Sequence, residues 1–471
     1  MKNILLFQIL NFLLLFSNSK KLISIYSINR HGARGPMSIN LDSKDFFGNL
    51  ILNKGKLTSY GERMLFILGL YKRNKYLNNN NNNFLNKKCD SNELYFVSTN
   101  LDRTIMSTLS QIFGFCYNSF NDKNINEKLV NFTYPPINIF ENEKMKHEIS
   151  LLNKEKFSLP FNINLLPYHI SKENEGKFLI TMSKKCRKEY EKILNKNLKE
   201  NKKIKEMVIK FNHLYGEKLN QLHNENKYYN FLEIFDITDQ YISSIYDGKK
   251  TNEILLKYKI EPEYFLKISK EVHYIFIIYY LFGDEKEESF KLETSLLLRD
   301  IILKFANNIY NENNIKTTLK NQKLFIANSH DSTIMGIQLF INSAYKLYEN
   351  IYENVIDISY SGSLTFELYK DDDEKTIFDI NNYYIDYSIN DKLIKRFSFN
   401  NFTKVINNFA WNEEKINQFC NEENYVLRQK IIILKIIIFT LIIFILCFVY
   451  LLFKNKKRYN NKNNENEIIL S

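Results

Sequence analysis

A long apolar run near the C-terminus sets the strongest limit on how this chain can be organised. Residues 436–453 have the sequence IIIFTLIIFILCFVYLLF, without a single charged side chain. Eighteen helical residues at about 1.5 Å each span about 27 Å, close to the hydrocarbon thickness of a bilayer. We therefore predict a transmembrane helix over residues 431–453, in which Lys435 extends its side chain toward the interface.

The two ends of the chain predict its orientation in the membrane. Four basic residues follow the apolar run directly and favour the cytoplasmic side, namely Lys454, Lys456, Lys457 and Arg458. Residues 1–19 have the features of a secretory signal peptide, with Lys2, an apolar stretch over 4–16, and serines at 17 and 19. We predict a type I single-pass membrane protein with residues 20–430 in a lumen or outside the cell, and a cytosolic tail over 454–471.

The composition is that of a globular protein with a basic excess. Hydrophobic residues make up 44% and charged residues 25%, which is ordinary for a folded domain. The net charge of +12 is spread along the chain and partly lies in the tail, whereas nucleic-acid-binding proteins more often gather it on one helix or arm. We expect no nucleic-acid partner.

Strand, loop and helix patterns follow one another at both ends of the lumenal part. Residues 22–29, 94–98 and 324–328 are predicted to be strands, and 364–369 alternates as a further strand. Helices are predicted from about residues 57, 103 and 333. This order predicts an α/β fold with a mostly parallel sheet and helices on both faces. The core would comprise about 20–117 and 314–410, with a mainly helical cap over about 118–313.

Apolar spacing predicts which faces of the first two helices are buried. In the first helix, Met64, Ile67, Leu68 and Tyr71 recur at helical intervals. In the second, the predicted buried residues are Ile105, Leu109, Ile112 and Phe113.

Charged residues gather in the three loops that follow the predicted strands. The loops contain Arg30, His31 and Arg34, then Arg103, then His330 and Asp331. Ligands of open α/β sheets bind beyond the carboxyl ends of the strands, so we expect these loops to meet. We expect Asp102, in the second loop, to cap the helix behind it.

This set of side chains favours chemistry on a phosphate ester. Three arginines around one point suit an oxyanion such as phosphate. His31 could attack phosphorus as a neutral imidazole, and Asp331 could protonate the leaving alkoxide. Gly32 is expected to let the backbone approach the phosphate. No His, Cys or carboxylate residues have the spacing of metal ligands, so we expect neither a metal nor a cofactor. We expect structural or surface roles for the other histidines, which are His147, His169, His213, His223 and His273.

The lumenal part also contains four cysteines and two glycosylation motifs. Cys89, Cys116, Cys186 and Cys420 would lie in an oxidising compartment, where they permit two disulfides in any of three connectivities. N-glycosylation is predicted at Asn131 and Asn401, each followed by Phe and Thr.

The sequence RHGARGP at 30–36, together with His330-Asp331, resembles the histidine acid phosphatases, the larger branch of the histidine phosphatase superfamily. Residues 57–61 and 98–104 are similar to further segments of that family. The resemblance implies the histidine phosphatase fold, with His31 as nucleophile and Asp331 as proton donor. It also implies that the phosphoryl group is held by Arg30, Arg34, Arg103 and His330. Cys186 has a counterpart in the family, for which Cys420 is the candidate partner.

The resemblance predicts a membrane-anchored acid phosphatase, similar in layout to the lysosomal and testicular members. Its partners would be small-molecule or protein phosphomonoesters and the membrane, with a homodimer left open. Two alternatives remain. One is a phytase, inositol polyphosphate phosphatase or lysophosphatidate phosphatase of the same fold, and the other is a catalytically silent membrane receptor.

The cytosolic tail resembles an acidic dileucine sorting signal. Glu465 stands four positions before the pair Ile469-Leu470. A sorting adaptor would then bind the tail and direct the protein to endosomes or a lysosome-like compartment, whereas without such an adaptor the cell surface is expected. The alternative is an unstructured polar tail with a chance aliphatic cluster.

Overall fold

The computed structural model describes most of the part that precedes the predicted span. The described residues are 20–37, 44–49, 54–77, 84–86, 89–117, 143–152, 165–171, 186–246, 248–283, 287–371, 379–420, 434, 437, 439, 440 and 443. The predicted signal peptide, Asn131, the cytosolic tail and most of residues 431–453 lie outside them. Among the described residues, no helix has both the length and the apolar character needed to cross a membrane.

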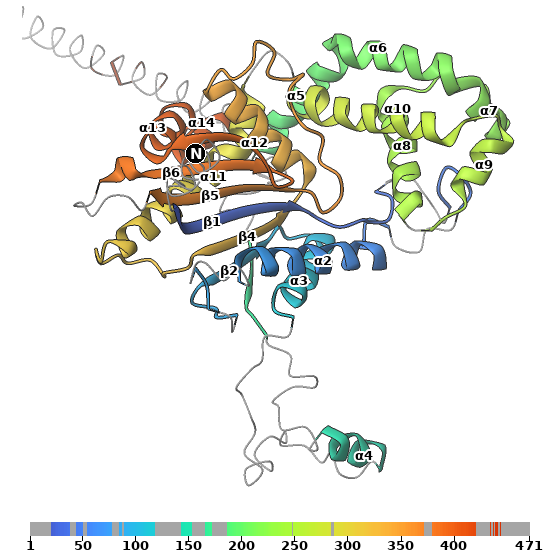
Figure 1. Ribbon diagram of the computed structural model, residues 1–471. Coiled ribbons are helices and arrows are strands. Elements are labelled where there is room, and N and C mark those ends of the chain that lie inside the picture. Colours follow the sequence, from blue (N-terminus) through green and yellow to red (C-terminus); the bar gives the residue numbers. More distant parts are fainter. Residues whose placement is uncertain are drawn as a thin grey trace, which may run out of the picture.

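One seven-stranded sheet forms the centre of the fold (Figure 1). The strand order is β3-β2-β4-β1-β5-β6-β7. The strands are β1 (Lys20–Arg30), β2 (Leu94–Ser98), β3 (Tyr168–Ile170), β4 (Leu324–Ser329), β5 (Ser363–Asp371), β6 (Tyr383–Ile389) and β7 (Lys392–Ser398).

The sheet is mixed, whereas the sequence pattern predicted a mostly parallel one. Strands β3, β2, β4 and β1 pair in parallel, and β1, β5, β6 and β7 pair antiparallel. Only Asn390 and Asp391 separate β6 from β7, and so short a connection can join only antiparallel strands. The prediction assumed that the strand–loop–helix pattern continues to the C-terminal part. There, β5, β6 and β7 instead pair antiparallel.

Helices cover both faces of the sheet, and a group of helices lies beyond the end of β1 (Figure 1). On one face lie α2 (Ser59–Tyr76) and α3 (Asp102–Phe115). On the other lie α11 (Glu288–Glu312), α12 (Asp331–Ala344) and α13 (Phe399–Phe409), with α14 (Glu413–Cys420) near them.

The helical group is mainly formed by the segment between β3 and α11. Its helices are α5 (Arg187–Glu200), α6 (Lys202–Phe211), α7 (Glu217–His223), α8 (Phe231–Tyr246), α9 (Thr251–Lys257) and α10 (Pro262–Ile275), with π-helical turns η6 (Asn212–Gly216) and η7 (Phe276–Leu281). The chain also has a helix α4 (Glu143–Leu152) and a short 3-10 helix η8 (Ile380–Asn382).

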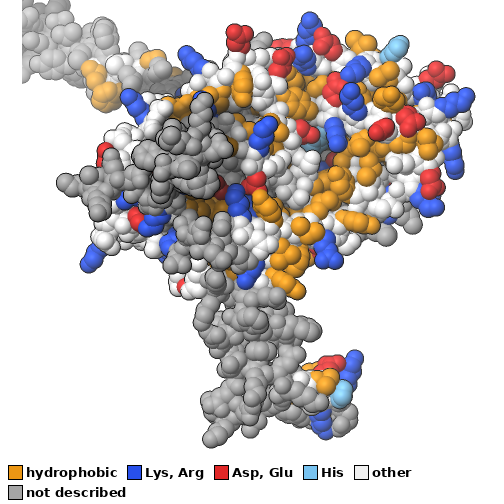
Figure 2. Space-filling model, in the orientation of Figure 1, with side chains coloured by type: hydrophobic (Ala, Val, Ile, Leu, Met, Phe, Trp, Pro, Cys, Tyr) orange, Lys and Arg blue, Asp and Glu red, His pale blue; other side chains and the backbone are white. Residues whose placement is uncertain are grey.

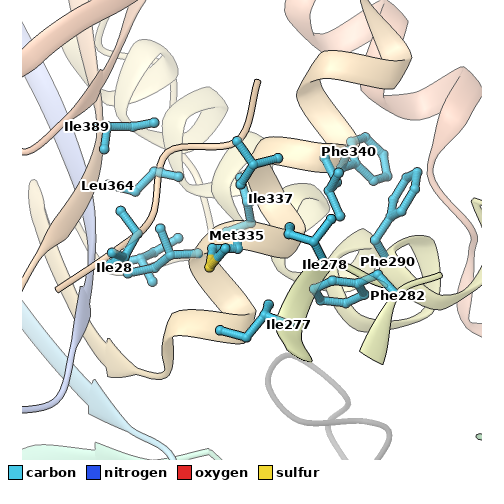
Figure 3. Close-up of a cluster of buried hydrophobic side chains, with 14 of the residues drawn as sticks. Ile28, Ile277, Ile278, Phe282, Phe290, Met335, Ile337, Phe340, Leu364 and Ile389 are labelled. Carbon is cyan, nitrogen blue, oxygen red and sulfur yellow. The ribbon is translucent and has the colours of Figure 1, made fainter. Parts of the chain in front are cut away.

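The main core lies between the sheet and the layer of α11 and α12, and it continues into the helical group (Figure 3). Ile28 and Leu364 of the sheet face Met335 and Ile337 of α12 in this close-up, and Ile278 of η7 lies beside them. All five side chains are completely buried. One continuous apolar cluster therefore joins the helical group to the sheet.

The predicted apolar faces of α2 and α3 are wrong in part. Ile67 and Tyr71 on α2 and Phe113 on α3 are largely exposed, whereas the buried face of α2 contains Gly61, Leu65, Gly69, Lys72 and Tyr76. The cause is the close approach of the two helices. A Cβ on Gly69 would lie 2.3 Å from the Gln111 carbonyl oxygen, and one on Gly114 would lie 2.0 Å from that of Phe66.

Two disulfides tie distant segments together. Cys89 pairs with Cys116, and Cys186 pairs with Cys420 across 234 residues of sequence. The second pair confirms the partner that the family resemblance favoured. It joins the start of α5 to the end of α14.

The charge on the visible surface is dispersed. On the face shown in Figure 2, Lys and Arg side chains alternate with Asp and Glu, and hydrophobic side chains lie between them. Asn401 is exposed on the first turn of α13, and its glycosylation stays a prediction.

Candidate active site

The three charged loops meet because their strands are parallel neighbours. Strand β4 lies between β2 and β1, and Arg30 pairs in register with Ser329 while Ser98 pairs with Asn328. The carboxyl ends of the three strands therefore reach the same edge of the sheet. All six predicted site residues gather there: Arg30, His31, Arg34 and His330 are buried, and Arg103 and Asp331 are half-buried.

The ring of His31 is held in one orientation. Its Nδ1 lies 2.8 Å from the carbonyl oxygen of Gly32, and because that oxygen can only accept, Nδ1 donates. Nε2 is therefore the nitrogen with a free lone pair. Burial, and then the charge of Arg103 and the other cationic neighbours, hold the pKa of His31 well below its usual range. The imidazole is neutral, as a nucleophile must be.

His330 is held by groups on α3 and on the loop before it. Arg103 approaches His330 Nδ1 at 3.5 Å, and Thr99 Oγ1 lies 3.1 Å from Nε2. Because a guanidinium can only donate, Nδ1 accepts and Nε2 donates to Thr99. Burial, followed by the charge of Arg103, lowers the pKa of His330 to about 3. His330 is therefore neutral, and in the site without substrate its N–H is donated to Thr99.

Arg30 and Asp331 form an ion pair with little exposure to solvent. Arg30 Nη2 lies 2.5 Å from Asp331 Oδ2, and Nη1 donates to the Ile358 carbonyl oxygen. The guanidinium lies 4.4 Å from the ring centre of Tyr360. Burial alone would raise the pKa of the Asp331 carboxyl, but Arg30 and then His273 outweigh it and hold that pKa far below its usual range. In the site without substrate, Asp331 is a carboxylate.

Arg34 is paired with an acidic residue of α8. Its two terminal nitrogens lie 2.8 and 3.1 Å from the two carboxylate oxygens of Asp239. Burial alone would lower the pKa of the Arg34 guanidinium, but the negative charge of Asp239 outweighs burial and raises that pKa. The pair links the loop after β1 to the helical group.

Gly32 lies in close contact with the first turn of α2, and its approach to the phosphate stays a prediction. A Cβ on Gly32 would lie 2.3 Å from the carbonyl oxygen of Gly61, and one on Gly61 would lie 2.2 Å from that of Ala33. The two glycines thus let the first turn of α2 pack against the loop that holds His31. This contact explains why the segment 57–61 is needed together with the sequence RHGARGP at 30–36.

Asp102 does not cap α3 as predicted. The capping position is Leu101, and it makes no side-chain hydrogen bond. Thr104 takes part in the turn instead, since its hydroxyl lies 2.8 Å from the Leu101 carbonyl oxygen and 2.7 Å from Thr99 Oγ1.

Three functional neighbours had no signal in the sequence. Asp239, His273 and Tyr360 lie far from the motifs along the chain and reach the site only through the fold. They help to line a small cavity of about 40 Å³, with Arg30, Ile242, Tyr246, Lys270, Asp357 and Ser359. His273 was expected to be structural or at the surface, yet its Nε2 lies 3.4 Å from Asp331 Oδ2.

The arrangement can bind an oxyanion and transfer its central atom. Three guanidinium groups face two carboxylates, which leaves one positive charge while the imidazoles are neutral. The Nε atoms of Arg30 and Arg103 are buried and have no hydrogen-bond partner among the described residues. Within the same residues, no group of three His, Cys, Asp or Glu side chains is placed to hold a metal ion.

Comparisons with known proteins bear on the same part of the chain. Residues 21–390 match the model of the histidine phosphatase superfamily (branch 2). Prostatic acid phosphatase of Mus musculus is 22% identical over 370 residues, which cover 77% of this chain and 80% of that protein.

Solved structures show the same fold. The phytase from Citrobacter braakii aligns with a TM-score of 0.54 at 12% identity, over 85% of this chain and 99% of that one. Hafnia alvei phytase in complex with tartrate aligns with a TM-score of 0.51 at 11% identity, over 83% and 98%.

Proposed function

Because the chain belongs to branch 2 of the histidine phosphatase superfamily and is a phosphatase, we propose that it hydrolyses phosphate monoesters at acid pH through a phosphohistidine on His31. The family and the α/β histidine phosphatase fold expected from the motifs are confirmed. The observation that supports this mechanism best is the orientation of His31, whose Nδ1 donates to the Gly32 carbonyl oxygen and leaves Nε2 free.

Substrate binding starts with an exchange of partners. Arg30 is held by the Asp331 carboxylate, and a phosphate dianion offers it more negative charge and more acceptor oxygens. Arg34 and Arg103 hold the remaining oxygens, together with His330 once its N–H turns from Thr99 to the phosphate. Once Arg30 turns to phosphate, Asp331 loses its main cationic partner and gains an anionic neighbour, so its pKa rises.

Two displacements complete the reaction. His31 Nε2 attacks phosphorus, an N–P bond forms, and the ester P–O bond breaks as the leaving oxygen takes a proton from Asp331. A water molecule then attacks phosphorus, giving a proton to the Asp331 carboxylate, and the N–P bond breaks. The products are the alcohol and inorganic phosphate, His31 is neutral again, and Asp331 again carries the proton that it held in the substrate complex.

The lining of the cavity favours simple phosphate monoesters over highly phosphorylated ones. Tyr246 and Tyr360 lie edge to face with ring centres 5.1 Å apart, and Asp239 and Asp357 lie near them. Besides Arg30, the basic residues in this lining are Lys270 and His273. Additional phosphate groups on a substrate would meet these carboxylates, whereas an uncharged or aromatic leaving group would not.

An activity assay of the lumenal domain against matched variants tests the proposal. The wild type should hydrolyse nitrophenyl phosphate with highest activity at acid pH, and EDTA should have no effect. His31→Ala should remove activity, whereas His213→Ala, which changes an exposed histidine of η6, should not. Measurable turnover by purified His31→Ala protein would refute the nucleophile assignment.

We also propose that the protein is membrane-anchored and delivered to an acidic compartment. The proposal is supported by the apolar run over 431–453 and by Glu465, Ile469 and Leu470 in the tail. A donor that must be protonated also works best at low pH. Replacing both Ile469 and Leu470 with Ala should shift the protein from endosomes or lysosome-like vacuoles to the cell surface, and an unchanged distribution would leave the tail without a sorting role.

A further inference from the structure

Besides Arg30, the Asp331 carboxyl has a second basic side chain next to it, His273 of the helical group. His273 Nε2, on α10, lies 3.4 Å from Asp331 Oδ2, the same oxygen that Arg30 Nη2 contacts. The other carboxylate oxygen, Oδ1, accepts the backbone N–H of Ser332 at 2.8 Å. Oδ2 is therefore the oxygen that can carry and release a proton, and His273 is placed against it.

The position of the His273 ring is fixed by its surroundings. The residue is buried on α10, and its ring is parallel to that of Phe235 on α8, with centres 6.0 Å apart. The charged groups around it are Asp331 on α12, Arg30 at the end of β1, Asp357 before β5, Asp239 on α8 and Lys270 on its own helix. Burial lowers the pKa of His273, and Asp331 opposes this effect.

The two nitrogen groups beside Oδ2 behave differently during the proposed reaction. Arg30 is needed by the phosphoryl group, whereas His273 lies on α10, among the residues that line the cavity. When Arg30 turns to phosphate, His273 remains beside Oδ2, and shortening of the 3.4 Å separation would let its Nε2–H donate to that oxygen. Without it the carboxyl could rotate away from the leaving oxygen.

We propose that His273 is a positioning residue that holds Oδ2 of Asp331 toward the leaving oxygen after substrate has taken Arg30. This inference rests on the proposed function. It means that the helical group, through His273 on α10, takes part in the proton transfer. Asp331 gives its proton from Oδ2 as the P–O bond breaks, and the new carboxylate accepts the Nε2–H of His273. In the second displacement Oδ2 takes a proton from water, and His273 keeps its own proton throughout.

The role predicts the direction of a pH effect. An N–H donor on Oδ2 stabilises the carboxylate form, whether His273 is neutral or protonated, and so lowers the pKa of Asp331 in the complex. Removing that donor raises this pKa. Because activity falls as the donor loses its proton, the alkaline limb of the pH profile of kcat moves to higher pH.

Two substitutions at position 273 distinguish the effect of the N–H group from the effect of the aromatic ring. His273→Phe keeps the stacking on Phe235 but has no N–H, whereas His273→Gln keeps an amide N–H within reach of Oδ2. We expect His273→Phe to lower kcat on glycerophosphate about tenfold, with a smaller loss on nitrophenyl phosphate and little change in KM. Its alkaline limb should move upward by about half a pH unit or more, and His273→Gln should restore both properties in large part.

A double-mutant comparison isolates the action through Asp331. In the Asp331→Asn background, His273→Phe should cost nothing further, because there is no proton donor left to position. An additive loss, or a loss of kcat with an unchanged alkaline limb, would overturn the proposal. His213→Phe is the matched surface control. A wild type that does not depend on His31 would instead overturn the proposed function, so the two failures are distinguishable.

Discussion

At the residue scale, the pH dependence of the site depends on which anion Arg30 holds. Without substrate, Arg30 lies 2.5 Å from Asp331 and keeps that carboxyl ionised. With a phosphate dianion in place, the carboxyl loses its partner and takes up a proton as the pH falls. Substrate binding thus prepares the proton donor, and activity should decline above neutral pH.

Replacing Asp331 with Asn should affect substrates unequally. An alkoxide is a poor leaving group and needs the proton, so kcat on glycerophosphate should fall by about 10²-fold or more. The loss on nitrophenyl phosphate should be much smaller. Because Asn does not pair with Arg30 as a carboxylate does, inorganic phosphate should inhibit the variant more strongly than the wild type. Equal losses on both substrates would argue against the proton-donor role.

The sequence predicts those site residues that lie at the end of a strand or within the few positions that follow it. Their placement follows from parallel pairing of β1, β4 and β2, which brings consecutive strand ends to one edge. Asp239 and His273 could not be predicted, because each lies within an amphipathic helix without a motif. Asp239 is 205 positions from Arg34, and only the packing of the helical group on the main core brings them together.

At the element scale, glycine contacts decide how α2 sits in the fold. The apolar periodicity of α2 favours burial of Ile67 and Tyr71, but both are largely exposed. Gly69 and Gly114 let α2 and α3 approach until backbone meets backbone, and this contact orients the helix more strongly than its larger side chains do. A prediction from apolar periodicity considers only the large apolar side chains and ignores glycines. It therefore predicted the helix correctly but not which of its faces is buried.

Adding one methyl group at the helix contact should destabilise the fold. In Gly114→Ala the new Cβ would lie 2.0 Å from the Phe66 carbonyl oxygen, so the helices must move apart. We expect a loss of about 1–3 kcal/mol in the free energy of unfolding, measured by urea denaturation. Gly216→Ala is the matched control, because the atoms nearest to its Cβ would be those of the Asn212 side chain, the first at 3.3 Å. A Gly114→Ala protein as stable as this control would contradict the account of the α2–α3 contact.

At the scale of the whole molecule, the active site makes the fold sensitive to acid. His31, His273 and His330 all have lowered pKa values, mainly through burial. Between the ordinary histidine pKa near 6.5 and the lowered value, the unfolded chain binds more protons than the folded one. Stability therefore rises with pH through this window and is lost as the pH falls. The lowered pKa values of Asp239 and Asp331 act in the same direction at still lower pH.

Unfolding experiments at two pH values test this sensitivity. At pH 4.5, each histidine that stays neutral in the fold costs about 2–3 kcal/mol relative to pH 7. The urea midpoint should therefore be lower at pH 4.5, and inorganic phosphate should recover part of the loss by binding the folded state. His330→Gln should lose less stability than the wild type between the two pH values, whereas His213→Gln should match the wild type. A midpoint that rises on acidification would contradict the burial of neutral imidazoles.

From the sequence, the presence of the helical group could be predicted, but not how it packs against the sheet. The sequence predicts a mainly helical segment, but the mixed sheet, the continuous apolar cluster and the contact of α10 with Asp331 depend on tertiary packing. Cys186 and Cys420 hold the start of α5 to the end of α14, a pairing that cysteine positions alone leave open among three connectivities.

The central claim, that His31 carries the phosphoryl group, is tested most directly by trapping the intermediate. The lumenal domain is mixed with substrate, quenched within milliseconds under denaturing conditions that are not acidic, digested, and analysed by mass spectrometry. We predict one phosphorylated histidine, on the peptide that contains His31, stable in base and lost on brief acid treatment. The signal should increase in Asp331→Asn protein with nitrophenyl phosphate, because Asp331 also accepts the proton of the attacking water. A phosphoryl group on another residue, or its absence from an active enzyme quenched during turnover, would contradict the account.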